Sequence, residues 1–229
     1  MSAHATGTTP PQRHGTWLLA VRTAFVVVVV ALLVRSIVVE WPRLGAALAD
    51  MNAVALIGAV SMTAVAQVAL WRSWHALLSG TGPGLPPHAS AVVFFVGQLG
   101  KYAPGGLWTV VAQTELGATH RVPRARGAMV SVASLAVLIA TGAGMGAVSV
   151  LATPGALDAY WWTLLLLVGG IVGLLPPVLN PLIRRVLRVV APRVAPTPMT
   201  GRTIGSSVLW ALGWWAAAGL HAWFLARAL

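Results

Sequence analysis

The chain has 229 residues, of which 58% are hydrophobic and 8% are charged, and its mean hydropathy is +0.82. Because a soluble domain carries about 25% charged residues, this composition excludes an ordinary soluble enzyme and predicts an integral membrane protein. The net charge of +11 therefore indicates orientation by the positive-inside rule and attraction to anionic lipid headgroups, and not binding to nucleic acid.

The N-terminal residues 1–16 are polar and small, so we predict a disordered cytoplasmic N-terminus. The apolar run that follows predicts a first span over residues 17–39. An alternative is that this run opens a secretory signal peptide with a cleavage site at residues 47–49. Pro42 and Arg43 interrupt the stretch before that site and favour a retained span.

Residues 17–229 are predicted to form a single all-α, polytopic transmembrane helix bundle. A full span needs roughly 20 apolar residues to cross a hydrocarbon layer of ~30 Å. The segments that meet this requirement are residues 17–39, 53–71, 127–151, 161–179 and 204–226. Tryptophans near the ends of these segments, Trp74 among them, are predicted to anchor an aromatic belt at the membrane surface.

Two arginine-rich segments, residues 117–126 and 180–203, are predicted to be loops between spans. Basic loops stay on the cytoplasmic side of a membrane. We therefore expect a multi-pass protein of a bacterial-type inner membrane with both basic loops in the cytoplasm. Charge counting alone leaves the side of the N-terminus open.

Residues 89–116 are apolar in part, but they carry Lys101 and the break Pro104-Gly105-Gly106. A single span would place the lysine near the bilayer centre at a cost of ~2.5–3.5 kcal/mol. The helix-breaking proline would add ~3 kcal/mol. A re-entrant hairpin avoids both costs, with residues 89–99 running inward, residues 103–106 at the tip and residues 107–116 returning. We expect about five full spans plus this hairpin; the alternative is six full spans.

The polar hairpin is also the predicted site. A helix that begins near Leu107 would direct unpaired amides and partial positive charge toward the tip, and Lys101 adds a full charge. Broken helices in transporters hold anionic groups in this way, so the tip suits the phosphate of a lipid headgroup. The predicted lipid-binding residues are Gln98, Gly100, Lys101, Tyr102, Pro104, Gly105, Gly106, Trp108, Gln113 and Glu115.

The alternative is that this segment is purely structural. Lys101 would then pair with Glu115 across the hairpin so that both charges are neutralised in a low-dielectric setting. The Pro-Gly-Gly sequence would be only a turn.

The stretch GKYAPGGLW, followed by AQTELG at residues 112–117 and by Val-Pro-Arg at 122–124, resembles a known family. It is similar to the lysylphosphatidylglycerol synthase transmembrane region, a family of flippase-like integral membrane proteins. The resemblance implies movement of an aminoacylated or polyprenyl-linked lipid between leaflets, or assistance to an enzyme that makes one. Family members carry a later Pro-Gly-rich motif that this chain lacks, so we expect a shortened member or a fragment, without the aminoacyl-transferase domain.

Signs of catalysis are absent from the sequence. Cysteine is missing, the six histidines show no metal-ligand spacing, and the four acidic residues are too dispersed for an acid–base pair. Ser131 and Ser134 are predicted to bond to the helix backbone or to a neighbouring helix. We expect no catalytic residue, metal or cofactor.

The expected function is lipid handling, as binding or translocation of an anionic or polyprenyl-linked lipid headgroup. The main alternative is a non-catalytic membrane subunit or partner of a glycosyltransferase or lipid synthase. A membrane-embedded transferase is disfavoured by the lack of an acid–base pair, and a small-solute transporter by the lack of an internal repeat.

Overall fold

The computed structural model describes residues 31, 34–36, 38, 39, 41, 51–102, 108–190 and 197–228. The chain divides into two units, Met1–Asn52 with Leu229, and Ala53–Ala228. The residues described between 31 and 41 are helical. The predicted N-terminus 1–16, most of the predicted span 17–39 and the signal-peptide cleavage site lie outside the described residues.

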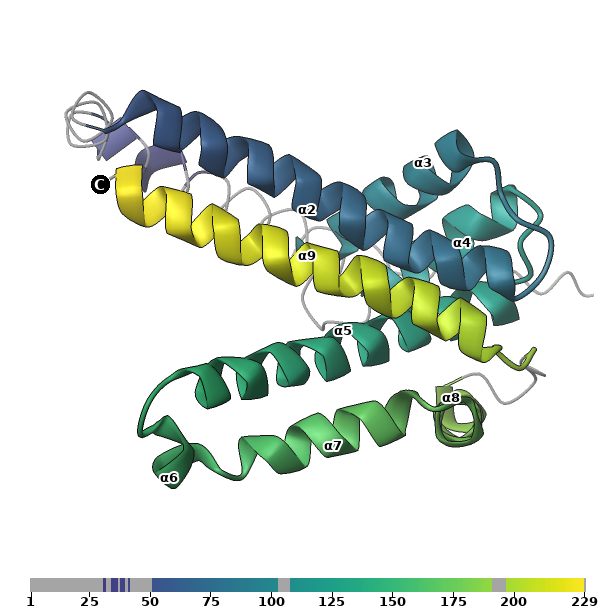
Figure 1. The fold of residues 1–229 in the computed structure, drawn as a ribbon. Helices are drawn as coiled ribbons and strands as arrows, with labels where there is room; N and C mark the ends of the chain where they lie inside the picture. Colours follow the sequence, from purple (N-terminus) through teal and green to yellow (C-terminus); the bar gives the residue numbers. More distant parts are fainter. Residues whose placement is uncertain are drawn as a thin grey trace, which may run out of the picture. The chain divides into compact units, whose positions relative to one another are not determined.

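The second unit is built from helices alone (Figure 1). In chain order they are α2 (Ala53–Gly80), α3 (Pro87–Gln98), the 3₁₀ turn η1 (Leu99–Tyr102), α4 (Trp108–Thr119), α5 (Arg124–Ala152), α6 (Ala156–Tyr160), α7 (Thr163–Leu174), α8 (Pro176–Val190) and α9 (Gly201–Ala228). Within the described residues, α2, α5 and α9 are long and apolar enough to cross a membrane, and the bent pair α7–α8 is a fourth candidate if it counts as one span. The all-α class is therefore confirmed for the described residues, and the three or four candidate spans support a multi-pass membrane protein.

Helices α2 and α9 lie side by side and antiparallel along their length (Figure 1). Near one end, Ser73 Oγ donates to the Ser207 carbonyl at 2.9 Å; near the other, His221 Nδ1 lies 3.0 Å from the Ala59 carbonyl. Small side chains on both helices are buried in this contact, as in membrane helix pairs that pack backbone to backbone. These include Ala55, Ala59, Ala66 and Ala69 of α2, and Ala211 and Ala217 of α9.

The large buried side chains gather where α2 ends and α5 and α9 begin. They come from five helices and form one cluster that includes Trp74, Leu77, Leu78, Val93, Phe94, Met129, Leu179, Ile183, Leu187 and Ile204. This cluster fixes α3 and α8 against the long helices. It corrects one prediction, because Trp74 is only 2% exposed and is no surface anchor. The physical reason is that α2 continues past the predicted end at residue 71 to Gly80, which carries Trp74 into the bundle.

The same end of the unit carries most of the described arginines. Arg121, Arg124, Arg126, Arg184, Arg185, Arg188 and Arg202 lie there, in or beside the helix ends and α8. Arg227 lies at the opposite end, in the last turn of α9. We call the end that carries these seven arginines the basic end. Figure 1 shows it where α2 ends and where α5 and α9 begin.

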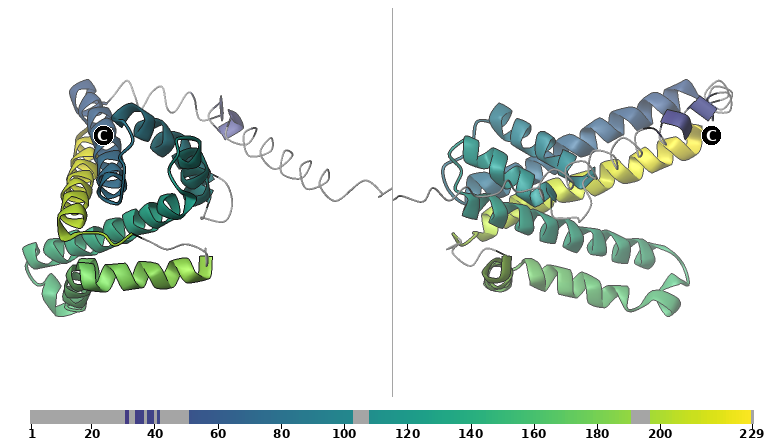
Figure 2. Two further views of the ribbon diagram at one scale, coloured as in Figure 1. Left: turned by 90° about the vertical axis from the view of Figure 1, so that its right-hand side faces the viewer. Right: turned by 180° about the vertical axis from the view of Figure 1, so that it is seen from behind.

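The predicted span 161–179 is not one continuous helix, because the helix breaks at Leu175 and the two parts meet at an 83° bend. Leu175 precedes Pro176 and adopts the extended conformation (φ −61°, ψ 135°) that a following proline imposes. In Figure 1, α7 is seen from the side and α8 nearly end-on; Figure 2 shows α8 along its length.

The predicted basic loop 180–203 is also helical over its first part, because α8 extends to Val190. One face of α8 places Leu179, Ile183 and Leu187 in the core cluster. Its three arginines, Arg184, Arg185 and Arg188, are exposed. Residues 191–196 of the predicted loop lie outside the described residues.

Candidate functional site

Helices α3 and α4 form an antiparallel hairpin. A Cβ on Gly97 would lie 3.2 Å from the Gln113 backbone nitrogen, and one on Gly100 would lie 2.6 Å from the Thr109 backbone nitrogen. Helix α3 begins after the loop that follows α2, and α4 ends at the loop that opens α5, so both open ends of the hairpin lie at the basic end (Figures 1 and 2). Gly100 thus has a packing role that the sequence did not reveal.

The closed end of the hairpin reaches well into the bundle. Gln98 and Thr109 share a cavity with Leu70 of α2 and Leu138 of α5. At 1.5 Å per residue, Leu70 lies about 15 Å from the end of α2 and Leu138 about 21 Å from the start of α5. Since these helices are 28 and 29 residues long, the closed end lies about a third of the way along α2 from its C-terminal end and about halfway along α5.

The cavity has a volume of about 270 Å³ and lies between α2, α3, α4 and α5. Its lining residues are Leu70, Trp74, Phe94, Gln98, Thr109, Val110, Gln113, Ser131, Ser134, Leu135 and Leu138. Among these described residues the polar groups are amides, hydroxyls and one indole, and none is charged. The described lining is therefore mostly apolar, with several neutral polar groups and no charge.

Gln113 connects the hairpin to α5. Its side chain is 3% exposed, and its Oε1 accepts a hydrogen bond of 2.8 Å from Ser131 Oγ. The expectation that Ser131 bonds a neighbouring helix is confirmed. No hydrogen bond joins the Gln113 amide nitrogen or the Gln98 side chain to the described part of the chain, so their bonding groups remain for a ligand or water.

Trp74 adds a second unused donor. Its Nε1 is buried and has no hydrogen-bond partner among the described residues, although the side chain lines the cavity. A buried unpaired donor costs about 1–3 kcal/mol, and because this nitrogen has almost no accessible surface, the cavity meets other atoms of the Trp74 side chain. Sequence patterns could not find this residue, because it lies on α2, far along the chain from the hairpin.

Lys101 and Tyr102 lie at the closed end of the hairpin and are exposed. The Lys101 Nζ is 5.2 Å from the centre of the Tyr102 ring, a cation–π distance. No carboxylate pairs with Lys101 in the described ranges. Of the other predicted residues, Trp108 begins α4 and is partly exposed at 44%, whereas Pro104, Gly105 and Gly106 lie outside the described residues.

The alternative pairing of Lys101 with Glu115 is wrong. Glu115 instead accepts two hydrogen bonds of 2.8 Å from Nε and Nη2 of Arg124, at the basic end. The bond from Arg124 holds the pKa of Glu115 below its usual value. Glu115 is several residues along α4 from the closed end, which is why it meets Arg124 and not Lys101. Glu115 does not line the cavity that Gln98 lines.

Two other features lie at the basic end, a buried arginine and a second cavity. Arg126 is 9% exposed, and it donates to the carbonyls of Leu78 and Pro83, the latter at 2.8 Å, and to Thr81 Oγ1 at 3.3 Å. It therefore holds the end of α2 and the following loop, which is a structural role.

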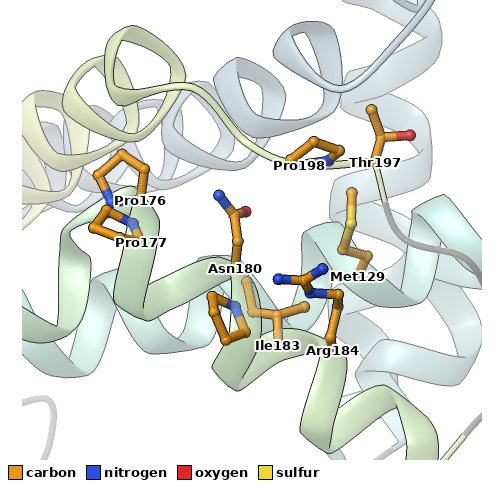
Figure 3. A pocket seen from close by; sticks show the side chains of 9 residues that line it. Met129, Pro176, Pro177, Asn180, Ile183, Arg184, Thr197 and Pro198 are labelled. Atoms are coloured by element: carbon orange, nitrogen blue, oxygen red, sulfur yellow. The ribbon is translucent and has the colours of Figure 1, made fainter.

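A cavity of about 360 Å³ lies between α8, Met129 and residues 197–198 (Figure 3). Prolines form much of its wall, and Asn180 is engaged by two bonds to the backbone of Met199, at 3.0 and 2.8 Å. Arg184 is the charged group of its described lining. Unlike the hairpin cavity, it has no buried unpaired donor among these residues.

The described residues contain no group of three or more His, Cys, Asp or Glu side chains placed to hold a metal ion. Comparison with protein-family models, with curated proteins and with solved structures found no match to this chain. The family resemblance of the GKYAPGGLW stretch stays a prediction.

Proposed function

We propose that this multi-pass membrane protein binds the headgroup of an anionic membrane lipid at the α3–α4 hairpin and carries it across part of the bilayer. The observation that supports this most is the uncharged cavity with amide and hydroxyl groups in its described lining, about a third of the way along α2 and halfway along α5. Membrane proteins rarely place polar groups at such depth unless the groups serve a ligand or a pathway.

In this proposal the hairpin is re-entrant. Both of its open ends lie at the basic end, which faces the cytoplasm by the positive-inside rule. Its closed end lies near the bilayer midplane, where irregular backbone is tolerated only if protein or a water-filled cavity surrounds it. Within α3 and α4 the hairpin meets these conditions, because α2 and α5 pack against it.

The charge at the closed end provides the attraction for a lipid phosphate. Lys101 supplies a cation with no described counter-ion, and the start of α4 at Trp108 adds the partial positive charge of a helix N-terminus. The headgroup would lie against Lys101 and the cavity while the tails stay in the lipid. This arrangement matches the flippase-like function that the sequence resemblance implies.

The test compares two exposed cations. The wild type, Lys101→Ala and Arg188→Ala are purified gently, and retained lipids are identified by native mass spectrometry. Arg188 is the matched control, because it is an exposed arginine on α8, away from the hairpin. We expect Lys101→Ala to lose an anionic lipid that Arg188→Ala retains. Equal losses would indicate nonspecific surface attraction and defeat the proposal; bulk lipid on all three, with a co-purifying membrane enzyme, would favour the non-catalytic subunit.

A further inference from the structure

We infer that the hairpin cavity takes a neutral, polyhydroxylated headgroup, such as a sugar ring joined to a lipid phosphate, and does not take an aminoacylated headgroup. This inference rests on the proposed function and names the substrate class of the same site. It is carried by the charges, hydrogen-bonding groups and volume of the cavity.

The absence of acidic groups from the described lining argues against a cationic headgroup. An aminoacyl ester carries an ammonium group, which needs a carboxylate when it leaves water, because an unpaired buried charge is strongly unfavourable. The nearest acidic residue along the chain, Glu115, is bonded to Arg124 and does not line the cavity. The cavity therefore offers an ammonium group no counter-ion.

The same reasoning about charge places the lipid phosphate outside the cavity. The described lining holds no cation, so a phosphate inside the cavity would also be uncompensated. Lys101 stands just beyond Gln98 in the chain and is exposed at the closed end. The two parts of the headgroup are thus separated, with the phosphate at Lys101 and the uncharged part in the cavity.

The hydrogen-bonding groups of the lining match those of a ring of hydroxyls. The Gln113 amide nitrogen only donates, whereas Gln98, Thr109 and Ser134 offer both donors and acceptors. A hydroxyl oxygen can accept from the Gln113 amide, and its hydrogen can bond to the Gln98 carbonyl or to a neighbouring hydroxyl. An apolar group would leave these lining groups unpaired.

The size and walls of the cavity fit one ring. Its volume of about 270 Å³ equals roughly nine waters at ~30 Å³ each, which is room for a single sugar ring but not for lipid tails. The rings of Trp74 and Phe94, with centres 5.8 Å apart, form part of an apolar wall against which the carbon face of a sugar can pack.

The experiment offers the purified full chain three lipids with the same acyl chains: phosphatidylinositol, phosphatidylglycerol and lysyl-phosphatidylglycerol. Competition is read by native mass spectrometry. We expect phosphatidylinositol, whose headgroup is a ring of hydroxyls, to be preferred over phosphatidylglycerol by about tenfold, the value of one to two net hydrogen bonds. Lysyl-phosphatidylglycerol is expected to bind most weakly.

The matched variants are Ser134→Ala and Ser149→Ala. Both remove a hydroxyl from α5, but Ser149 is exposed, its Oγ donates to the Met145 carbonyl at 3.0 Å, and it is not a lining residue of the cavity. Ser134→Ala should reduce the preference for phosphatidylinositol, and Ser149→Ala should keep it. If Ser134→Ala does not fold, Gln98→Leu removes a lining amide and should reduce the same preference.

The outcomes separate this inference from the proposed function. Equal binding of phosphatidylinositol and phosphatidylglycerol, lost in Lys101→Ala, would overturn the sugar-ring inference and leave the headgroup site standing. Preference for lysyl-phosphatidylglycerol would overturn the inference directly. If no anionic lipid binds in a Lys101-dependent way, the proposed function itself fails.

Discussion

The α3–α4 hairpin and the α7–α8 pair are both made of short helices, yet they place their polar side chains differently. In the hairpin, neutral Gln113 is turned inward and bonded to Ser131. In α8, Arg184, Arg185 and Arg188 are exposed, while leucine and isoleucine side chains enter the core. A neutral amide can be buried for the cost of finding one partner, whereas a guanidinium needs water, headgroups or a counter-ion.

This difference separates a site from a surface. The hairpin has an uncharged cavity with amide and hydroxyl groups in its described lining, which can select among headgroups. Helix α8 has the exposed arginines and amphipathic pattern of a helix that lies at a membrane surface, where attraction is less selective. The following predictions test that contrast, from the largest expected effect to the smallest.

The largest effect is expected in the topology of the chain, which is measured as the side of a sealed vesicle from which single cysteines are labelled. Because the chain contains no cysteine, Gly84→Cys and His120→Cys can be labelled cleanly at the two ends of the hairpin. Both should react with an impermeant maleimide from one side, together with Arg185→Cys on α8, and Asp158→Cys of α6 should react from the other. Labelling of positions 84 and 120 from opposite sides would establish the six-span alternative.

The next effect concerns the close approach within the hairpin. Gly100→Ala places a methyl group 2.6 Å from backbone atoms of Trp108 and Thr109, which cannot move as a flexible side chain would. We expect a destabilisation of about 1–3 kcal/mol, measured as a lower midpoint of thermal unfolding in detergent. Gly169→Ala of α7 is the control, because its methyl group meets nothing within 4 Å. Equal midpoints for the two variants would contradict the packing role of Gly100.

A smaller effect is expected from the bond between α4 and α5. A double-mutant cycle with Gln113→Leu and Ser131→Ala should give a coupling energy of about 0.6 kcal/mol, the mean measured for hydrogen bonds between membrane helices, and no more than about 1.7 kcal/mol. The unfolding free energy in mixed micelles supplies the measurement. Arg185→Gln on α8, an exposed change, should alter stability by no more than about 0.5 kcal/mol. Zero coupling between Gln113 and Ser131 would show that the buried amide is not held by this bond.

The smallest effect is the pH dependence of the exposed Glu115–Arg124 pair. The pKa of Glu115 is lowered in the folded state by the bond from Arg124, so the pair contributes stability above the unfolded pKa of the carboxyl group. That contribution is lost as the pH falls through the folded pKa. Glu115→Gln should therefore lower the melting midpoint slightly at pH 7 and not at pH 3. A difference that persists at pH 3 would assign it to another cause.

The sequence predicted the regions of the long helices well. The predicted spans 53–71, 127–151 and 204–226 fall inside α2, α5 and α9, because an apolar run of that length has few alternatives in a membrane. It also indicated a break between residues 99 and 107, since a lysine and a Pro-Gly-Gly sequence oppose a continuous span. The bend at Leu175 was not predicted although Pro176 imposes it, because the apolar residues on both sides of the proline were counted as one span.

The partners of the polar side chains could not be predicted in the same way. Trp74 and Ser134 reach the cavity from helices distant in the sequence, and Glu115 bonds to Arg124 rather than to Lys101 because of its place along α4. Such contacts depend on which helices pack together and in what register, which no local pattern records.

The sequence by itself determined that this is an all-helical membrane protein with an interrupted polar segment, because hydrocarbon admits apolar helices and opposes buried charge and broken backbone. The tertiary structure alone decided that Gln98 and Gln113 share a cavity with Trp74, that this cavity is uncharged among its described residues, and that the arginines of α8 are exposed. Composition sets the free energy of each segment in the membrane, whereas a site is defined by distances between segments, and those are fixed only when the helices pack.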